Sequence, residues 1–388
     1  MSTQAHPLRS VSQRIQSVVW DETSPLTRTM ETREGPLMTR HGRFVGGQSD
    51  GVEVIEVDTG AVRFWILPSR GMSIWRLEKA GHTFGWRSPV AGPIHPDRVP
   101  VLDPGGLGWL EGFDELLVRC GLESNGAPQF SSDGQLLYPL HGRIANLAAD
   151  SLSIEYDEAS GRLEVIAEII EAKLFFKRLR LRSRVRVRAG QSEIELLDDV
   201  SNDLAKPAAM QLLYHINVGP PVLGEGASVE VPLQELAPKD DLSAGEIESW
   251  NQFGPPEESY SERVYFATLR ADESNLTTAL LKSKDSDLGL AVGFSVKGLP
   301  RFVLWKNTAA ESDGYVVGLE PATNYPNTRG FEEQQGRVVT IPAGETVSFR
   351  VSIDPLTDED AVQAVSQTIK RMQGDDPPTV HESPKNGW

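Results

Sequence analysis

Short runs in which hydrophobic and polar residues alternate dominate the chain and predict a protein built mainly of β-strands. Residues 52–67 read VEVIEVDTGAVRFWIL, two β-branched runs on either side of Asp58-Thr59-Gly60. Side chains of a strand point alternately to its two faces, and glycine tolerates the positive φ of a tight turn. We therefore expect a β-hairpin over this segment.

A longer alternating run, residues 172–197, predicts a long strand, a turn at 189–192 and a second strand. Its first strand carries an arginine at every second position: Arg178, Arg180, Arg182, Arg184, Arg186 and Arg188. These arginines form either a nucleic-acid surface or a solvated sheet face whose charges meet acidic residues on neighbouring strands. The acidic balance of the whole chain favours the solvated face.

Further apolar or alternating runs extend the strand pattern through the second half of the chain. They cover residues 163–170, 276–283, 288–296, 301–307, 315–320, 336–341 and 345–353. Helical spacing is clear only in Val362, Val365, Ile369 and Met372, and the polar, proline-rich residues 374–388 are expected to form a loosely held tail.

The strands do not alternate with helical segments, which argues against a doubly wound α/β fold. The prediction is an all-β fold, a large two-sheet sandwich in a single domain with few short helices. We expect an N-terminal extension over residues 1–34, the sandwich over 35–355, and a C-terminal helix and polar tail over 356–388.

Composition narrows the function classes. The chain has 38 basic and 55 acidic residues, a formal net charge of −17, so nucleic-acid binding is not expected. Its single cysteine, Cys120, excludes an intrachain disulfide and a cysteine-cluster metal site, and is expected to be a small core residue. No run approaches the roughly eighteen apolar residues of a membrane span, and no Sec signal is visible, so a cytoplasmic protein is expected.

The common catalytic templates are missing from the sequence. It contains no GxxxxGK[ST], GxSxG or HExxH, and Gly105-Gly106-Leu107-Gly108 lacks the spacing of a dinucleotide-binding loop. Function must therefore come from side chains that are distant in sequence.

Three residues stand out as candidates. His141 lies in a loop shaped by Pro139 and Gly142, and the nearby Arg143 and Asn146 are both suited to recognising hydroxyls, although a structural histidine is the alternative. His215 stands near the end of an apolar run and can exchange protons at neutral pH, or it is an interior histidine bonded to a carbonyl. Glu320 closes another apolar run, where burial would raise its pKa toward that of a general base, although such glutamates are often on the surface.

A second cluster contains three carboxylates among aromatic residues, in the segment Trp109-Leu110-Glu111-Gly112-Phe113-Asp114-Glu115. Paired carboxylates beside stacking rings can bind or hydrolyse a sugar. Solvated loop charges are the alternative interpretation.

Five segments, taken in order, carry a family resemblance: LPSRGMSI (67–74), GGLGWLEGFDELLVRCGLESNG (105–126), PLHGRIANLAA (139–149), LLYHINVGPPVL (212–223) and VVGLEPATNYPN (316–327). Together they resemble the aldose 1-epimerase-related proteins, and more closely the branch of that superfamily known as DUF4432. The resemblance covers about residues 35–355 and implies the galactose mutarotase β-supersandwich.

The resemblance also implies roles for individual residues. Mutarotases use a strand histidine as general acid, a glutamate on a later strand as general base and another histidine to hold the sugar, which by motif position resemble His215, Glu320 and His141. The remaining predicted substrate-binding residues are Arg70, Trp109, Glu115, Arg143, Asn217 and Asn324.

Such side chains require no metal or cofactor, because the base removes the anomeric hydroxyl proton while the acid protonates the ring oxygen. We expect an isomerase of carbohydrate metabolism that interconverts sugar anomers, with a monosaccharide or sugar derivative as its partner and neither nucleic acid nor membrane; a homodimer is left open. One alternative is a non-catalytic sugar-binding or sensing protein. Another is an oligosaccharide hydrolase or lyase acting through Glu111, Asp114 or Glu115.

Overall fold

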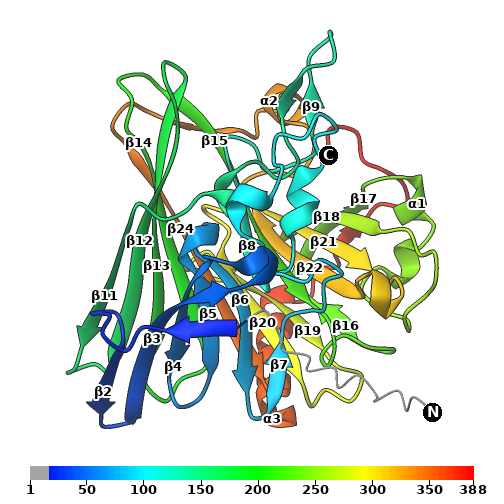
Figure 1. Ribbon diagram of the computed structural model, residues 1–388. Helices are drawn as coiled ribbons and strands as arrows, with labels where there is room; N and C mark the ends of the chain where they lie inside the picture. The colour runs from blue at the N-terminus through cyan, green and yellow to red at the C-terminus, as the bar shows by residue number, and fades with distance from the viewer. Residues whose placement is uncertain (1–16) are drawn as a thin grey trace, which may run out of the picture.

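Two large β-sheets packed against each other make up the protein in the computed structural model, which describes residues 17–388 (Figure 1). Within those residues fifteen strands belong to the first sheet and eight to the second. The predicted all-β two-sheet sandwich is therefore confirmed.

The first sheet runs β1 (Ser17–Trp20), β3 (Gly35–Val45), β4 (Glu53–Asp58), β5 (Arg63–Leu67), β6 (Ser73–Lys79), β8 (Leu117–Leu122), β15 (Ala208–Val218), β22 (Val316–Ala322), β21 (Arg301–Asn307), β18 (Arg263–Leu269), β17 (Leu233–Pro238) and β25 (Thr379–Val380). Beside this path, β2 (Arg28–Thr32) pairs with β3, β7 (His82–Phe84) with β6, and β23 (Val339–Ile341) with β15.

The second sheet runs β11 (Ser151–Asp157), β12 (Arg162–Lys173), β13 (Lys177–Arg188), β14 (Ile194–Asn202), β24 (Thr346–Leu356), β20 (Gly289–Ser295), β19 (Leu276–Lys282) and β16 (Ser228–Glu230). A separate ribbon pairs β9 (Gln129–Phe130) with β10 (Leu136–Tyr138).

Helices are few in the described part of the chain: α1 (Asp241–Ala244), α2 (Arg329–Gln334) and α3 (Glu359–Gln373). Single 3₁₀ turns are η1 (Gly47–Ser49), η2 (Pro68–Arg70), η3 (Pro96–Arg98), η4 (Gly108–Gly112), η5 (Ile144–Asn146), η6 (Ile247–Ser249) and η7 (Glu311–Asp313). No helix within residues 17–388 is both long and apolar enough to cross a membrane. As predicted, α3 turns Val362 and Ile369 inward, against Leu280 of β19.

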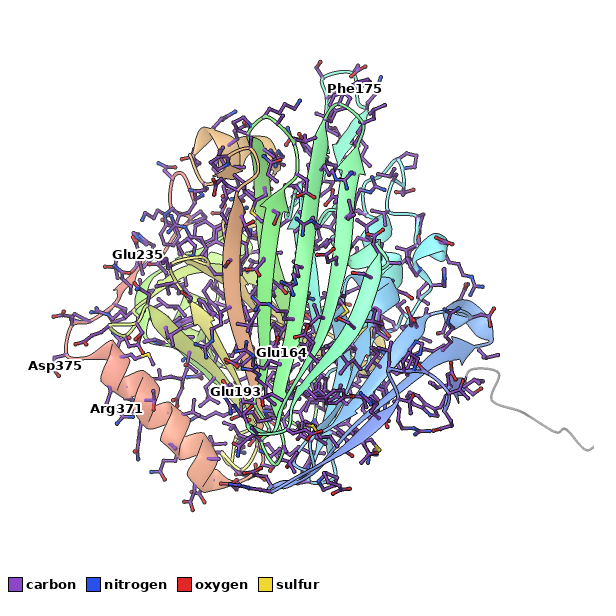
Figure 2. The ribbon with its side chains drawn as sticks, turned by 90° about the vertical axis from the view of Figure 1, so that its left-hand side faces the viewer. Glu164, Phe175, Glu193, Glu235, Arg371 and Asp375 are labelled. Carbon is purple, nitrogen blue, oxygen red and sulfur yellow. The ribbon has the colours of Figure 1, made fainter. Side chains whose placement is uncertain are left out.

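The arginine-bearing strand β13 has the predicted solvated, charged face. Arg186 donates to Glu164 at 2.8 Å, Arg184 to Asp199 at 2.9 Å and Arg180 to Glu168 at 3.2 Å, all carried by neighbouring strands. The strand begins at Lys177 and not near residue 172, because residues 174–176 form the tip of a hairpin, where Phe175 projects from the sheet (Figure 2).

Both sheets contribute alternate side chains to one core between them. On β15 the inward residues include Leu212, Tyr214 and Ile216. A buried polar network crosses this core: Arg119 of β8 binds both carboxylate oxygens of Asp198 of β14, at 2.6 and 3.0 Å. The intervening residues of β15, among them His215, consequently point to the outer face of the first sheet.

The expectation of a loosely held tail is wrong. Strand β25 pairs in parallel with β17, and the Trp388 ring lies 5.0 Å from that of Tyr325. Lys385 donates to Glu235 at 2.6 Å. Backbone pairing, ring packing and a charged contact together outweigh the polar composition of residues 374–388 and dock them on the edge of the first sheet.

Candidate active site

His215 and Glu320 meet at the centre of the first sheet, on its outer face. The pairing of Asn217 with Gly318 and of Leu213 with Ala322 places His215 directly across from Glu320 on adjacent strands. His215 Nε2 lies 3.2 Å from Glu320 Oε1, and the two residues are only 4% and 2% exposed. Neither residue ends its strand, since β22 continues through Pro321 to Ala322 and β15 continues to Val218.

Asn217 determines which nitrogen of His215 is free. Its Nδ2 donates to two carbonyls, those of Glu115 at 2.9 Å and His215 at 3.1 Å, so its Oδ1 must be an acceptor. That oxygen lies 2.5 Å from His215 Nδ1, which must carry a proton. Only Nε2, the nitrogen facing Glu320, is left to exchange a proton.

Burial shifts the proton affinity of this pair in opposite directions. Burial, with a smaller contribution from the carboxylate of Glu262, raises the pKa of Glu320 well above its usual range. Burial and the neighbouring His141 lower the pKa of His215 well below its usual range. Both shifts favour the neutral forms of the pair, the carboxylic acid of Glu320 and the imidazole of His215.

Aromatic rings surround the His215 imidazole. Ring centroids lie at 5.1 Å for Phe113, 5.3 Å for Trp305, 5.5 Å for His141 and 6.2 Å for Trp109. The turn η4 supplies the Trp109 ring and is followed directly by Phe113. These rings help to bury His215 and Glu320, and this burial is the main cause of their shifted pKa values.

His141 reaches the same site on a constrained loop. It has φ 57° and Gly142 φ 71°, and a Cβ on Gly142 would lie 2.1 Å from the carbonyl oxygen of Ser124, so only glycine fits there. His141 Nδ1 lies 2.8 Å from the carbonyl oxygen of Asn125 and must donate to it. Burial lowers the pKa of His141 to about 4, which leaves Nε2 a neutral acceptor.

Asn324 supports this loop from below. Its amide exchanges two hydrogen bonds with that of Asn125, at 3.0 and 2.9 Å, and both side chains are fully buried. Asn324 thus contacts the residue whose carbonyl oxygen binds His141. Its amide also donates to the carbonyl of Tyr325 and accepts from Thr323, so the protein itself uses its hydrogen-bonding groups.

Arg70 and Glu115 form a buried ion pair beneath the site. Arg70 Nε donates to Glu115 at 2.6 Å, and its other nitrogens donate to the carbonyls of Ile94 and Gly112 and to Asn146 Oδ1 at 2.8–3.0 Å. Four of the five guanidinium N–H groups are therefore engaged by the protein. Arg70 and Glu115 are therefore better placed to hold the surrounding loops than to contact a sugar directly.

The two remaining carboxylates of this segment do not form a catalytic pair. Glu111 is exposed, whereas Asp114 is buried and accepts from Trp75 Nε1 at 2.9 Å. Burial and the adjacent Glu115 raise the pKa of Asp114 to about 7. Since Glu115 is bound by Arg70, no two of the three carboxylates are free to act together.

Of the other predicted residues, Trp109 packs against both histidines of the site. The Trp109 ring lies 4.6 Å from that of His141, and its buried Nε1 has no hydrogen-bond partner among the described residues. Arg143 is half-buried at the start of η5, and its side chain bonds to nothing within residues 17–388. Cys120 is buried with Trp109 in the cluster beneath the site, as expected for a small core residue.

Gly318 and Phe113 are site residues that sequence reasoning missed. A Cβ on Gly318 would lie 2.6 Å from Glu320 Oε1 and 3.1 Å from His215 Cε1, so the glycine leaves the space in which the pair meets. A glycine inside an apolar strand run was a usable signal, because it often marks a close approach. Nothing local distinguished Phe113 from a core aromatic residue.

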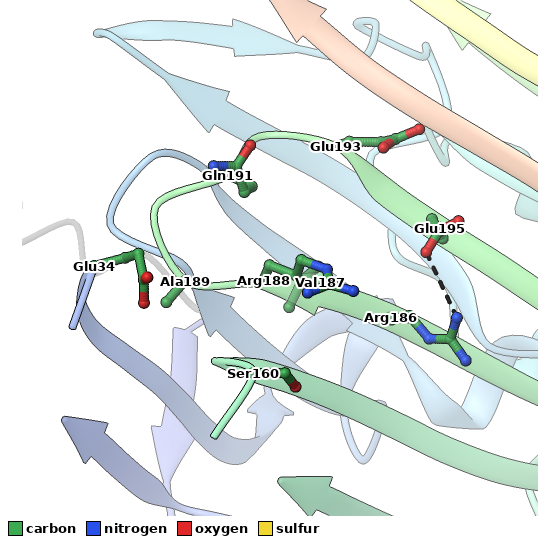
Figure 3. A pocket seen from close by; sticks show the side chains of 9 residues that line it. All are labelled: Glu34, Ser160, Arg186, Val187, Arg188, Ala189, Gln191, Glu193 and Glu195. Atoms are coloured by element: carbon green, nitrogen blue, oxygen red, sulfur yellow. Dashed lines mark ion pairs between the residues drawn. The ribbon is translucent and has the colours of Figure 1, made fainter. Parts of the chain in front are cut away.

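A separate surface hollow of about 310 Å³ lies on the second sheet, at the turn between β13 and β14 (Figure 3). Charged residues line it, and Arg186 pairs across it with Glu195 at 3.8 Å. None of its lining residues belongs to β15 or β22. The proton-exchanging chemistry is gathered at His215 and Glu320, so we place the candidate site there.

No group of three metal-ligating side chains is arranged around a common point in residues 17–388. The sequence-based expectation that the protein works without a metal or cofactor stays a prediction.

Comparison with known proteins agrees with this architecture. The family model described as a domain of unknown function, DUF4432, matches residues 49–354. A sequence comparison with curated proteins gives no significant match.

Solved structures share the fold. A Klebsiella pneumoniae protein provisionally assigned as an aldose 1-epimerase superposes with a TM-score of 0.88 at 29% identity, covering 95% of this chain and 99% of its own. A galactose mutarotase-like protein from Clostridium acetobutylicum gives 0.55 at 15% identity over 83% and 99% of the two chains. The galactose 1-epimerase of Lactobacillus acidophilus gives 0.54 at 16% identity over 82% and 98%.

Proposed function

The chain belongs to the DUF4432 family and has the galactose mutarotase-like fold, and from that premise we propose that it is an aldose 1-epimerase-like isomerase acting on a monosaccharide or sugar derivative. The observation that carries the proposal is the buried contact of 3.2 Å between His215 Nε2 and Glu320 Oε1. Two proton-exchanging groups thus face the same space, which is what anomer exchange requires.

In the proposed reaction the pair first rearranges internally. The proton moves from Glu320 to Nε2 of His215, which produces a carboxylate and an imidazolium without any gain or loss of protons. Sugar hydroxyls that replace the apolar surroundings supply hydrogen bonds to both charges.

Ring opening then uses both groups at once. Glu320 takes the proton of the anomeric hydroxyl while His215 gives the Nε2 proton to the ring oxygen, and the bond between that oxygen and the anomeric carbon breaks. The aldehyde rotates, and closure on its other face returns both protons. Asn217 holds the imidazole throughout, because its Oδ1 accepts from Nδ1.

Substrate contacts come from groups with unused hydrogen-bonding capacity. Trp109 Nε1 and Glu320 Oε1 are buried without hydrogen-bond partners within residues 17–388, and such atoms in a native protein call for a water or ligand. His141 Nε2 accepts a hydroxyl, and Arg143 is a further donor. Because His215 and Glu320 are almost fully covered, a sugar reaches them only when one of the surrounding rings moves aside.

Exchange spectroscopy by NMR on a panel of sugars tests the proposal. We expect the parent protein to accelerate anomer exchange of at least one sugar, and Glu320→Gln to lower that acceleration by about 10²–10⁴-fold while retaining affinity for that sugar. Saturable binding without any exchange across the panel would assign a sensor instead, and release of new reducing ends from oligosaccharides would assign a hydrolase.

A further inference from the structure

Lys239 extends the outer face of the first sheet at its far edge. Its backbone N–H donates to Val264 O at 2.9 Å, which continues the pairing of β17 with β18 beyond Pro238 and Tyr265. Val264 pairs with Trp305 on β21. Directly paired residues of antiparallel strands share a face, so Lys239 lies on the same face as Trp305.

The same row of residues leads to the acid–base pair. Trp305 pairs with Gly318 of β22, and Gly318 with Asn217 of β15. From β22 to β17 there are three strand spacings, about 14 Å. A lysine side chain and a pyranose ring together can bridge that distance.

The Lys239 ammonium is exposed and has no ion-pair partner within residues 17–388. The nearby acidic side chains are already occupied. Asp240 caps α1 through Ser243 at 2.8 Å, Glu246 pairs with Arg263 at 2.9 Å and with Lys306 at 3.2 Å, and Glu262 accepts from Trp305 Nε1 at 2.7 Å. Lys239 is therefore an unpaired cation on the face that carries the site, in a chain with a net charge of −17.

The fully buried side chains of the site offer no comparable charge, and the half-buried Arg143 is a second cation without a side-chain partner within residues 17–388. Arg70 is neutralised by Glu115 at 2.6 Å, and burial lowers the pKa values of both His141 and His215. Lys239 is nevertheless within electrostatic range, because its charge acts to lower the pKa values of Glu320 and His141. A ligand whose neutral end lies at the pair and whose anionic end lies at the rim matches this distribution.

We propose that Lys239 forms a rim subsite for an anionic group carried by the sugar away from its anomeric carbon. The substrate class is then acidic sugars, either uronates or sugar phosphates, and the ammonium discriminates them from neutral aldoses by a charge-assisted hydrogen bond. The inference rests on the proposed site at His215 and Glu320 and adds a specificity-determining residue to it.

Isothermal titration with glucose, glucuronate and glucose 6-phosphate tests this subsite in the parent protein and in Lys239→Met. We expect at least one acidic sugar to bind more tightly than glucose, and Lys239→Met to weaken that sugar about fivefold while leaving glucose unchanged, the size expected of an exposed charge pair. Comparing the two acidic sugars distinguishes phosphate from carboxylate. Lys297→Met, an exposed lysine just beyond β20 of the other sheet, is the matched control and should change nothing.

Several outcomes overturn the subsite: equal losses for glucose and the acidic sugars, no loss in Lys239→Met, an anion-specific loss in Arg143→Met alone, or no binding of either acidic sugar by the parent protein. Anomer exchange is measured separately on the same samples. Anion-selective binding without anomer exchange supports the Lys239 subsite and contradicts the isomerase. Anomer exchange, together with equal affinities for neutral and acidic sugars, supports the isomerase and contradicts the subsite.

Discussion

At the residue scale, the proposed chemistry depends on a histidine that has only one free nitrogen. Asn217 commits Nδ1 of His215, and Glu320 faces Nε2 at 3.2 Å. Burial makes both charged forms costly, so it favours the state in which Glu320 and His215 are both neutral. A buried pair of this kind is typical of functional sites, because the protein core gains little from it.

Removing either partner should abolish anomer exchange without unfolding the protein. We expect Glu320→Gln and His215→Asn each to lower the exchange rate by about 10²–10⁴-fold, the usual contribution of a positioned acid or base. NMR exchange rates measure the effect, and thermal unfolding checks that each variant folds. The control is Glu273→Gln, an exposed carboxylate between β18 and β19. Variants that unfold at the parent temperature yet exchange at the parent rate would contradict the assignment.

The pH profile of kcat/KM, which reports the pKa values of the free enzyme, should be bell-shaped, with limbs assigned opposite to the ordinary order of these groups. The active pair carries one proton, and it gains a second only below the lowered pKa of His215 and loses its last above the raised pKa of Glu320. The acidic limb therefore belongs to His215, below its ordinary pKa of 6.5, and the basic limb to Glu320, above its ordinary 4.5. The residual activity of Glu320→Gln should lack the basic limb. A basic limb that persists in this variant would refute the assignment.

At the element scale, β15 and β22 place the pair by direct cross-strand pairing, and η4 and the loop before η5 cover it. A strand holds a side chain more rigidly than a loop does, because ladder hydrogen bonds define its register. The covering rings come from irregular segments, which are the parts able to move when a ligand enters.

Gly318→Ala should impair catalysis through geometry alone. The new Cβ would lie 2.6 Å from Glu320 Oε1, the free end of a flexible side chain, so the carboxylate shifts and the fold tolerates the change. Displacing a reacting group by about 1 Å can cost 10²-fold, and we expect a loss of about 10- to 100-fold in kcat. Gly224→Ala, where a Cβ meets nothing within 4 Å, is the control. Parent-like kcat in Gly318→Ala would show that the carboxylate position is not critical.

At the scale of the whole molecule, the buried Arg119–Asp198 pair joins the two sheets directly behind the site. Arg119 also donates to the carbonyl oxygens of Gly71 and Met72, and Tyr214 donates to Asp198 at 2.7 Å. The turn held by Arg119 follows Arg70, and Tyr214 precedes His215. Sheet packing and site geometry are thus coupled through one polar network.

Asp198→Asn should destabilise the protein by about 3–5 kcal/mol, because it leaves a buried guanidinium without its counter-charge. Urea unfolding measures the loss. The neighbouring residue Asp199 faces solvent and pairs with Arg184 at 2.9 Å, so Asp199→Asn should cost less than about 1 kcal/mol. Equal costs for the two variants would mean that the inter-sheet pair contributes little.

Much of the fold could be predicted from periodicity. The hairpin of β4 and β5, the strand β13 with its charged face and the helix α3 all follow from local spacing, because alternation and helical repeat record which face of an element is buried. The docked tail could not be predicted, since its polar residues are held by Glu235 and Tyr325, distant in sequence.

The candidate site, too, could be predicted only in part. Residue type, local pattern and family resemblance identified His141, His215 and Glu320 from the sequence. Tertiary structure alone decided that His215 and Glu320 face each other, that Phe113 and Trp109 cover them, that Glu115 engages Arg70, and that Lys239 stands at the rim. Local sequence records which side of a strand is buried, but strand pairing and solvent exclusion arise from contacts between segments distant in sequence. These contacts set the distances and proton affinities on which the proposed chemistry depends.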